Sequence, residues 1–594
     1  MVRPMVRRSI RPYHRRLAIV LAGILFPALG ATTAPASRIL DLGSLGLYGE
    51  YGYGDSEAVA VNDAGQVIGN TEVFGADGPH GFLYDHGRMI DLGTLGGSFS
   101  SVVAINESGQ VIGVSETGTG QSHAFLYADG VMIDLGTLGG TTSRPTAIND
   151  SGQIVGESAI AGDGSSHAFL YDSGVMIDLG TLGGTSSTAV DINSRGQVVG
   201  NASTAGDATS WAFLYDGGAM SSLGGLYDDT MSLAVGINDA GDVLGASSGG
   251  LPPLGGSYPH WRGFLLRGGA MLALEDLVGG SEAVHYTLPY LLADNGEVAF
   301  SAEMYTPYGW GPHEFLFGGS TLLFHSFDEG GSSCFKPREI VGVNDSGIAL
   351  GNACGAFLYD PRNTGSFVDL VDTFYGQAAG RVVGAGGADL NNLGNVVGQM
   401  QISDGGSGTY GHAFLLACPL QPRTDCLEGS RSVLRIRRDD AGTGDSLMWR
   451  WAGRDPVTLE DLGTPGSDNP LTLCLYQSVG GKDDLSTSLR IPPGSAWAEG
   501  KTGAWRYRSE AWGPSGVERA WLKPGSTAKP ARVGILASGH RLQLPPPSDT
   551  SITSLEPRVV VQLHSETTPM CWMSEFRTAE VNDRYLFYAK RSGN

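Results

Sequence analysis

The sequence predicts an all-β protein in which an eight-bladed β-propeller precedes a second domain, a β-sandwich or jelly roll. One pattern recurs eight times between Ser37 and Ala417. Each copy holds four short apolar–polar alternations separated by Gly, Asn and Asp, which is the strand content of one propeller blade. The 91 glycines fall at fixed repeat positions, so they are interpreted as turn residues of a short-stranded fold.

The hinge of each copy is an Asn or Asp that opens a turn such as Asn-Asp-Ser-Gly. Asn and Gly tolerate positive φ, so this turn joins the first two segments as a hairpin. The third segment reads His-Ala-Phe-Leu-Tyr and the fourth Val-Met-Ile-Asp-Leu-Gly. The hinges recur about every 45 residues, the period of one supersecondary unit, and are Asn62, Asn106, Asn149, Asn193, Asn238, Asp294, Asn344 and Asn391.

The two ends of the array indicate a closed ring. The array begins with an isolated fourth segment at residues 38–43 and stops after a third segment at 412–416. A ring completes its last blade with the strand from the other terminus, which leaves no blade open at its outer edge. We therefore predict closure by residues 38–43. The alternative is an open β-solenoid, which would need end caps that the sequence does not show.

The His-Ala-Phe-Leu-Tyr-Asp core, followed by Asp-Leu-Gly-Thr-Leu-Gly-Gly, resembles the HAF family of extracellular repeats found in exported bacterial proteins. The resemblance covers residues 38–417 and is most specific in the first four repeats. It implies export, and it brings no established activity.

Residues 1–36 have the features of a secretory signal peptide. Six arginines and no acid precede the apolar stretch Leu17–Leu29, and small residues then offer cleavage after Gly30 or Ala36. The stretch is too short for a membrane span, so we expect a mature chain without one, secreted or held in the periplasm or cell envelope.

The mature chain would be strongly acidic. Removing six arginines leaves 32 basic against 61 acidic side chains, a net charge near −29. Such a charge disfavours nucleic acid and anionic membranes as partners. We expect no cofactor, because the sequence has no complete nucleotide-binding or metalloprotease motif.

Six cysteines lie in the second half of an exported chain, and an even count favours disulfides. We predict Cys334 with Cys354 inside one repeat and Cys418 with Cys426 in a linker at 418–428. The third predicted pair is Cys474 with Cys571, which would join strands across the C-terminal domain.

Residues 429–594 keep strand-like alternations but lose the repeat. Segments such as 447–451, 471–476 and 559–563 are separated by Pro, Gly and Ser turns, which favours a β-sandwich or jelly roll. The order of Trp449, Trp451, Cys474, Trp505 and Trp572 resembles an uncharacterised C-terminal module of secreted proteobacterial proteins. That resemblance implies no known function.

Three features invite a catalytic or metal-site interpretation, and we favour a structural one for each. The repeat histidines are replaced elsewhere by Trp211, Trp261 and Cys354, which are not interchangeable metal ligands. The Asn-Asp-x-Gly turns lack the ligand ladder of a calcium loop. The GxSxG match at residues 245–249 follows a strand but leads into Leu-Pro-Pro and not into a helix.

Departures from the repeat are the best candidates for a binding site, because insertions in such arrays fall in loops on one face. The sixth repeat holds an aromatic run from which we predict ligand contacts at Tyr305, Tyr308 and Trp310. Exposed aromatic rings stack on sugars or anchor a protein partner. The alternative is that these rings only pack over a lengthened loop.

The sequence thus predicts a secreted or cell-envelope scaffold without catalysis, which recognises extracellular polysaccharide or a surface protein. An extracellular hydrolase or lyase acting on polysaccharide at the propeller mouth is the second hypothesis. Carboxylates converging at the mouth would favour that enzyme, whereas Ser, Thr and Gly there would favour the scaffold. A purely structural role in a surface layer is the third.

Overall fold

The computed structural model has an all-β architecture in the residues that it describes. These are residues 40–592 except for 47–53, 86–87, 250–260, 279–283, 307–308, 319–320, 326–338, 346, 353–355, 361–365, 370–381, 393, 404–408, 417, 419–421, 423–425, 438–444, 454–456, 459–464, 466–470, 480–481, 492–495, 501–502, 510–516, 526–529, 539–557, 566–570 and 583–585. Two short 3₁₀ turns, η2 (Ala205–Asp207) and η3 (Leu274–Val278), interrupt the strands.

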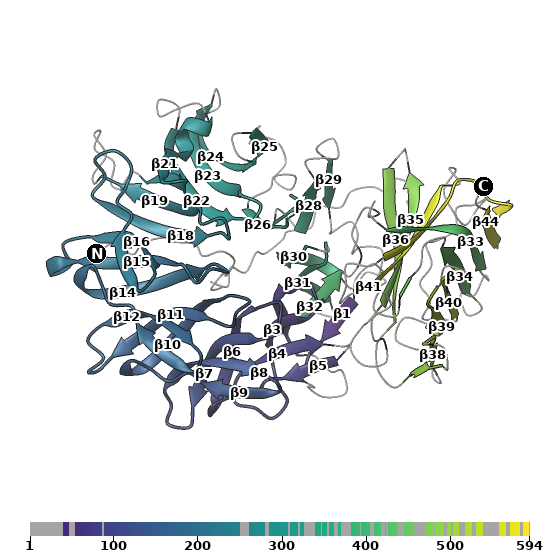
Figure 1. Cartoon of the computed structure of the whole chain (residues 1–594), viewed down its shortest axis with the longest axis horizontal. Helices are drawn as coiled ribbons and strands as arrows, with labels where there is room; N and C mark the ends of the chain where they lie inside the picture. Colours follow the sequence, from purple (N-terminus) through teal and green to yellow (C-terminus); the bar gives the residue numbers. More distant parts are fainter. Residues whose placement is uncertain are drawn as a thin grey trace.

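Eight four-stranded antiparallel sheets surround a common centre as the blades of a propeller (Figure 1). Blades 1 to 4 follow the chain in order. Their strands are β2 (Ser56–Val61), β3 (Val67–Thr71), β4 (His80–Asp85) and β5 (Arg88–Asp91); β6 (Gly96–Ile105), β7 (Val111–Thr117), β8 (Ser122–Ala128) and β9 (Val131–Asp134); β10 (Gly139–Ile148), β11 (Ile154–Ile160), β12 (Ser166–Asp172) and β13 (Val175–Asp178); β14 (Gly183–Ile192), β15 (Val198–Thr204), β16 (Ser210–Asp216) and β17 (Ala219–Ser222).

Blades 5 to 7 repeat this order, and blade 8 takes its fourth strand from the start of the chain. The strands are β18 (Met231–Ile237), β19 (Val243–Ser248), β20 (Arg262–Arg267) and β21 (Ala270–Ala273); β22 (Val284–Leu292), β23 (Glu297–Thr306), β24 (Gly309–Gly318) and β25 (Thr321–His325); β26 (Glu339–Val343), β27 (Ala349–Asn352), β28 (Ala356–Asp360) and β29 (Ser366–Asp369); β30 (Val382–Leu390), β31 (Val396–Ser403), β32 (Thr409–Leu416) and β1 (Leu40–Gly43).

Ring closure by the N-terminal strand is confirmed. β1 pairs antiparallel with β32, with Leu40 opposite Leu415. The carboxylate of Asp41 lies 2.8 Å from Nδ1 of His412, which ties the two ends of the array a second time. Residues 38 and 39 of the predicted closing segment lie outside the described residues.

A buried serine joins most blades to their predecessors. Ser143 of blade 3 accepts a hydrogen bond from the backbone N–H of Ala124 and donates one to the carbonyl of Gly136, both in blade 2. Because the hydroxyl satisfies one donor and one acceptor at a dry interface, it holds two neighbouring sheets in register. The serines in this position are Ser56, Ser100, Ser143, Ser187 and Ser232.

The glycine in the second strand of the repeat is required by close packing. In blade 2 a Cβ added to Gly113 would lie 2.3 Å from the carbonyl oxygen of Ser101 and 2.6 Å from the ring of Phe125. Phe125 is fully buried, so the repeat Phe fills the space that the glycine leaves. Blade 6 is the exception, with Phe300 opposite Phe315 and the two rings stacked at 5.3 Å.

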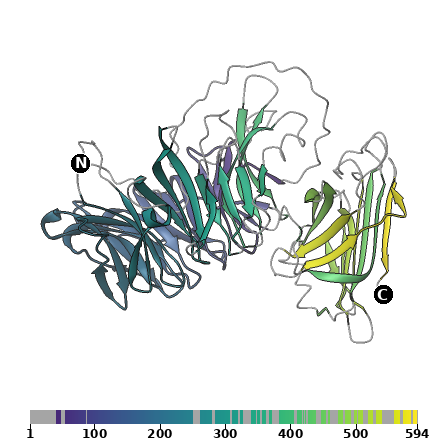
Figure 2. The same ribbon diagram turned by 90° about the horizontal axis from the view of Figure 1, so that it is seen from above.

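The C-terminal domain is one twelve-stranded sheet that curls so that two arms face each other, as the layers of a sandwich do (Figure 2). Trp449, Trp572 and Leu473, from both arms, are buried in its core. The strands are β33 (Leu427–Arg437), β34 (Ser446–Gly453), β35 (Leu471–Val479), β36 (Lys482–Ile491), β37 (Trp497–Glu499), β38 (Trp505–Arg508), β39 (Val517–Lys523), β40 (Arg532–Ser538), β41 (Val559–Ser565), β42 (Cys571–Phe576), β43 (Val581–Asn582) and β44 (Leu586–Ser592).

The outer face of β35, β41 and β42 packs against the last two blades. Tyr476 and Val560 are buried in one cluster with Leu350 of blade 7 and Leu416 of blade 8. Residues of opposite parity on the same strands, such as Leu475, face the core of the domain itself. One buried cluster therefore spans the boundary between the last two blades and the outer face of the C-terminal sheet, separate from the core of that domain.

The predicted disulfide pairing is wrong for the four cysteines that the structure describes. Cys418 pairs with Cys474 and Cys426 with Cys571, with Cα separations of 5.9 and 4.7 Å. Cys474 cannot reach Cys571, because β41 lies between β35 and β42 and next-but-one strands are about 10 Å apart. Cys334 and Cys354 lie outside the described residues.

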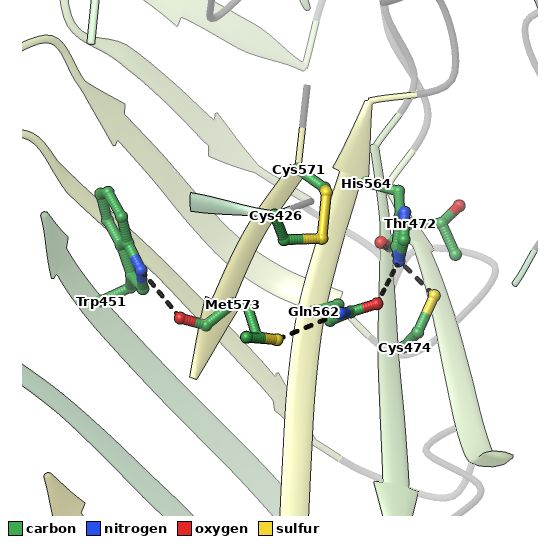
Figure 3. The surroundings of a disulfide bond; sticks show 8 residues. All are labelled: Cys426, Trp451, Thr472, Cys474, Gln562, His564, Cys571 and Met573. Carbon is green, nitrogen blue, oxygen red and sulfur yellow. Dashed lines mark hydrogen bonds between the residues drawn. A yellow bond between two sulfur atoms is a disulfide. The ribbon is translucent and has the colours of Figure 1, made fainter. Parts of the chain in front are cut away.

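Figure 3 shows the surroundings of the second disulfide. Cys571 stands opposite His564, which bonds the side chain of Gln562 on the same strand. The indole N–H of Trp451, in the other arm of the sheet, donates to the carbonyl of Met573. Both disulfides therefore attach the segment that leaves the propeller to strands of the C-terminal sheet.

Candidate functional site

Strand order divides the connections between two faces of the propeller. Each sheet is antiparallel, so the first–second and third–fourth connections lie at one end of the strands, which we call the turn face. The second–third connections and the crossings to the next blade lie at the other end, which we call the loop face. The Asn-Asp-x-Gly turns are on the turn face. The ends of β19 and β20, and of β23 and β24, between which two repeats depart from the consensus, lie at the loop face.

The hinge asparagines form a belt of hydrogen bonds around the propeller axis. Nδ2 of Asn106 donates to the carbonyl of Asn149 at 3.1 Å, and Nδ2 of Asn149 to that of Asn193 at 3.0 Å. Nδ2 of Asn391 donates to the carbonyl of Asn62 at 2.8 Å, across the junction between the ends of the array. These side chains are buried, so the amides are bound into the ring and not offered to a ligand.

The hinge of the sixth repeat is shifted by one residue from the predicted Asp294. Ala293 accepts the turn bond from Gly296 that the hinge Asn accepts elsewhere, and its carbonyl receives Nδ2 of Asn238. Alanine has no amide to continue the belt, and Nδ2 of Asn295 donates to the carbonyl of Asn344 instead. The belt therefore stays continuous through a different residue.

The residue after each hinge forms a second ring, and six of its eight members are acidic. The backbone N–H of Glu107 donates to the carboxylate of Asp150, and that of Asp63 donates to Glu107. Carboxylates therefore line the mouth of the propeller on the turn face, and many of them accept hydrogen bonds that join neighbouring blades. The ring is Asp63, Glu107, Asp150, Ser194, Asp239, Asp294, Asp345 and Asn392.

Desolvation, and after it mutual repulsion, raises the pKa of two carboxyls in this ring. Partial desolvation, together with the charges of Asp63, Asp150 and Asp389, raises the pKa of Glu107 to about 7. Burial and the charges of Asp239, Asp345 and Asp150 also raise the pKa of Asp294. A carboxyl that is partly protonated near neutral pH can act as a general acid, so Glu107 is the strongest acid–base candidate on the turn face.

Asp191 lies in a bulged first strand, where the register with β15 shifts between Ala189 and Asp191. The bulge aims its carboxylate at the next blade, where it accepts the N–H of Ile237 at 3.0 Å. Burial is the main reason that the pKa of Asp191 is raised to about 6. All eight blades have this bulge: Ala58/Ala60, Val102/Ala104, Pro145/Ala147, Ala189/Asp191, Ala234/Gly236, Pro289/Leu291, Ile340/Gly342 and Gly387/Asp389.

We predict that Asp191→Asn flattens the pH dependence of stability. The folded-state pKa is above the unfolded value of about 3.9, so this carboxyl stabilises the fold most below about pH 4. That contribution is lost as pH rises through about 6. The variant should therefore be more stable than wild type at pH 8, by up to about 3 kcal/mol. Urea unfolding at pH 5 and 8 measures this, with exposed Asp77→Asn as the control; equal pH slopes for wild type and Asp191→Asn would contradict it.

The repeat histidines pair with carboxylates inside single blades. Nδ1 of His123 lies 2.9 Å from Asp134, on the neighbouring fourth strand, and His167 pairs with Asp178 in the same way. Each pair belongs to a separate blade, so these histidines do not converge. In the described part of the chain, no group of three or more His, Cys, Asp or Glu side chains is arranged to hold a metal ion.

The sequence match to GxSxG is part of the blade architecture. Ser247 Oγ accepts the backbone N–H of Leu226, as Ser115 accepts that of Leu95 and Ser158 that of Leu138. Ser247 lies on β19, and no nearby His accepts its proton among the bonds described. Strand register also corrects the alignment of the fifth repeat. Arg262 stands opposite Ser247, so Arg262, and not Trp261, occupies the position of the repeat histidine.

The aromatic residues proposed for ligand contact are only partly described. Tyr305 and Trp310 stand opposite each other in register, next to the tip of the β23–β24 hairpin. Each strand of this hairpin has ten residues against seven in blade 2, so the hairpin extends further on the loop face. Tyr308 lies outside the described residues. Tyr290, from the same aromatic run, bonds Glu314 at 2.7 Å and so supports the blade.

Comparison with known proteins places the chain near no described family. No family model matches it, and no curated protein does. Among solved structures, it is similar to the β-propeller domain of the Trilobed protease from Pyrococcus furiosus, at 10% identity over 53% of this chain and 95% of that one, with a TM-score of 0.33.

Two peptidases are also similar in structure. Porphyromonas gingivalis dipeptidyl peptidase 4 matches 72% of this chain and 68% of its own at 10% identity and a TM-score of 0.38. The acylaminoacyl peptidase of Pyrococcus horikoshii matches 70% and 60% at 10% identity and 0.32. Within the residues described, no helix is both long and apolar enough to span a membrane.

Proposed function

We propose that this protein is an exported recognition scaffold, whose rigid propeller presents loop-face residues to an extracellular polysaccharide or surface protein without covalent chemistry. One observation carries the proposal. The shared residues of the repeat have structural partners: the belt asparagines and the serines join neighbouring blades, and the His–Asp pairs join strands within a blade. What remains free to specify a ligand is the set of residues that differ between repeats.

Export is supported by the two disulfides, because such bonds persist in oxidising compartments. The acidic charge, −23 for the whole chain, favours an uncharged or basic partner over nucleic acid. The proposed compartment is therefore the cell exterior, the periplasm or the cell envelope.

The test is binding of the purified exported protein to an array of polysaccharides and cell-surface proteins, with release of products followed in the same wells. Binding without products is the expected result. Release of products would overturn the scaffold proposal. Absence of both binding and products in every well would leave a purely structural role.

A second candidate, a polysaccharide hydrolase or lyase, has one specific observation in its favour. The ring at the turn-face mouth holds six carboxyl groups beside Ser194 and Asn392, and the pKa of Glu107 is about 7. Against this, the carboxylates of Glu107 and Asp150 accept backbone N–H groups from the adjoining turns, which assigns them a structural task.

The substitution Glu107→Gln separates the two candidates. The amide oxygen can still accept the N–H of Asp63, so the ring should stay closed. A scaffold keeps full ligand binding in this variant, measured on the same array. Loss of product release by about a hundredfold or more, with binding retained, would instead establish Glu107 as a general acid.

A further inference from the structure

Blade 5 carries a connected set of departures from the repeat on the loop face. Glu275 replaces a glycine that has positive φ in five other copies, such as Gly136, and Arg262 replaces the histidine. The partner Asp of that histidine is lost as well, because Ala273 stands opposite Phe264 where Asp134 stands opposite Phe125.

These changed residues contact one another. Arg262 Nη1 lies 2.6 Å from Asp229, whose other oxygen accepts Ser247 Oγ at 2.6 Å. The guanidinium lies 5.6 Å from the centre of the Tyr227 ring. The phenol of Tyr227 in turn reaches Glu275 at 3.4 Å. Three separate loop-face connections therefore meet in a single polar network.

Tyr227 is the residue that blade stability does not explain. It follows Leu226 as Gly96 follows Leu95 and Gly139 follows Leu138, and those glycines have φ of 100° and 103°. Tyr227 itself has a φ of 50° and is 67% exposed. A bulky side chain in the left-handed region strains the backbone, and an exposed ring gains no burial that would offset this cost. The combination points to a functional use of Tyr227.

The chemistry of the cluster selects among ligands. Asp229 and Glu275 are nearly buried, at 9% and 2% exposure, and oppose the single charge of Arg262, so the site has no surplus positive charge for an anion. The positive charge of Arg262 next to the Tyr227 ring also disfavours a cationic ligand. The groups that solvent can reach are the exposed ring of Tyr227 and the guanidinium of Arg262, whose side chain is 28% exposed. Together they match a ring-shaped ligand with an apolar face and hydroxyl groups that accept hydrogen bonds.

We propose that the loop face of blade 5 is a binding site for a neutral saccharide, with the ring of Tyr227 as the stacking platform and Arg262, held in place by Asp229, as the hydrogen-bonding group. This inference rests on the proposed recognition function and names its site. It also moves the main contact from the sixth repeat, where the sequence placed it, to the fifth.

The experiment uses the full exported chain and a panel of neutral cello-, xylo-, manno-, malto- and chito-oligosaccharides beside acidic glycans. Dissociation constants of the best ligand are then compared across variants by calorimetry. Tyr227→Gly restores the residue of the other repeats, so the blade should fold with an unchanged or higher melting temperature. We expect its affinity to fall at least about tenfold, whereas Tyr227→Phe, which keeps the ring, should stay within about threefold.

Phe74→Ala is the matched control, because Phe74 is a 70% exposed aromatic on the loop face of blade 1. It should bind as wild type does. Wild-type affinity in Tyr227→Gly would overturn the blade 5 site while leaving the recognition function standing. Binding only to acidic glycans or to surface proteins would also overturn the site, and absence of any binding would overturn both proposals.

Discussion

The double substitution Cys426→Ser with Cys571→Ser should destabilise the C-terminal domain more than any single core truncation. This disulfide closes a loop of 145 residues between the start of β33 and β42. Removing a cross-link of that length returns chain entropy to the unfolded state worth about 5 kcal/mol in the loop-closure treatment. Differential scanning calorimetry should show the transition of the C-terminal domain shifted to lower temperature.

The second disulfide provides the matched comparison. Cys418→Ser with Cys474→Ser opens a loop of 56 residues, for which the same treatment gives about 4 kcal/mol. Because Cys418 and Cys474 lie in the cluster shared with blades 7 and 8, this pair should also weaken docking of the two domains. Faster proteolysis between residues 416 and 427 measures that loosening. Unchanged melting in both double variants would contradict the structural role assigned to the bonds.

The ring was predictable from the sequence because its signals are local and repeated. Alternation marks the strands, Asn and Gly mark the turns, and a spare fourth segment at one end matches a missing one at the other. Pairing of Leu40 with Leu415 confirms the closure that this count requires. Eightfold repetition compensates for the weakness of each single strand signal.

Cysteine pairing depends on strand order, which spacing along the chain does not contain. Cys474 and Cys571 looked like partners across a domain, but β41 separates their strands. The bulge in each first strand could not be predicted for a similar reason, because a bulge is a mismatch in register between two strands and not a property of one strand alone. The shifted sixth hinge shows the same limit, because Ala293 keeps the turn without the side chain that marks it.

The repeats act as internal controls for function. A residue shared by most blades, such as Asn149 or Ser143, has a partner in a neighbouring blade that explains it. The sequence pointed to departures from this pattern, but it ranked them by aromatic content and so favoured Tyr305 and Trp310. Recognising Tyr227 needs its φ and its contact with Arg262, because only the backbone shows that it occupies a glycine position.

Breaking the belt at its closing joint should destabilise the propeller and also make it unfold faster. Asn391→Ala removes a buried amide that donates to the carbonyl of Asn62 at 2.8 Å and accepts the N–H of Asn395 at 2.8 Å. Each buried group left unpaired costs about 1 to 3 kcal/mol, so we expect a loss of about 2 to 4 kcal/mol in the unfolding free energy of the propeller.

The position of Asn391 adds a kinetic effect that the same substitution at Asn149 lacks. Asn149 joins blades that are consecutive in the chain, whereas Asn391 joins blade 8 to blade 1, where pairing of β1 with β32 and noncovalent contacts between the two blades close the ring. When the two variants lose the same free energy of unfolding, Asn391→Ala should therefore unfold faster than Asn149→Ala. Denaturant-jump experiments measure these unfolding rates. Ser151→Ala, in an exposed turn, controls for local effects; equal unfolding rates for the two Asn variants would show that the belt does not close the ring.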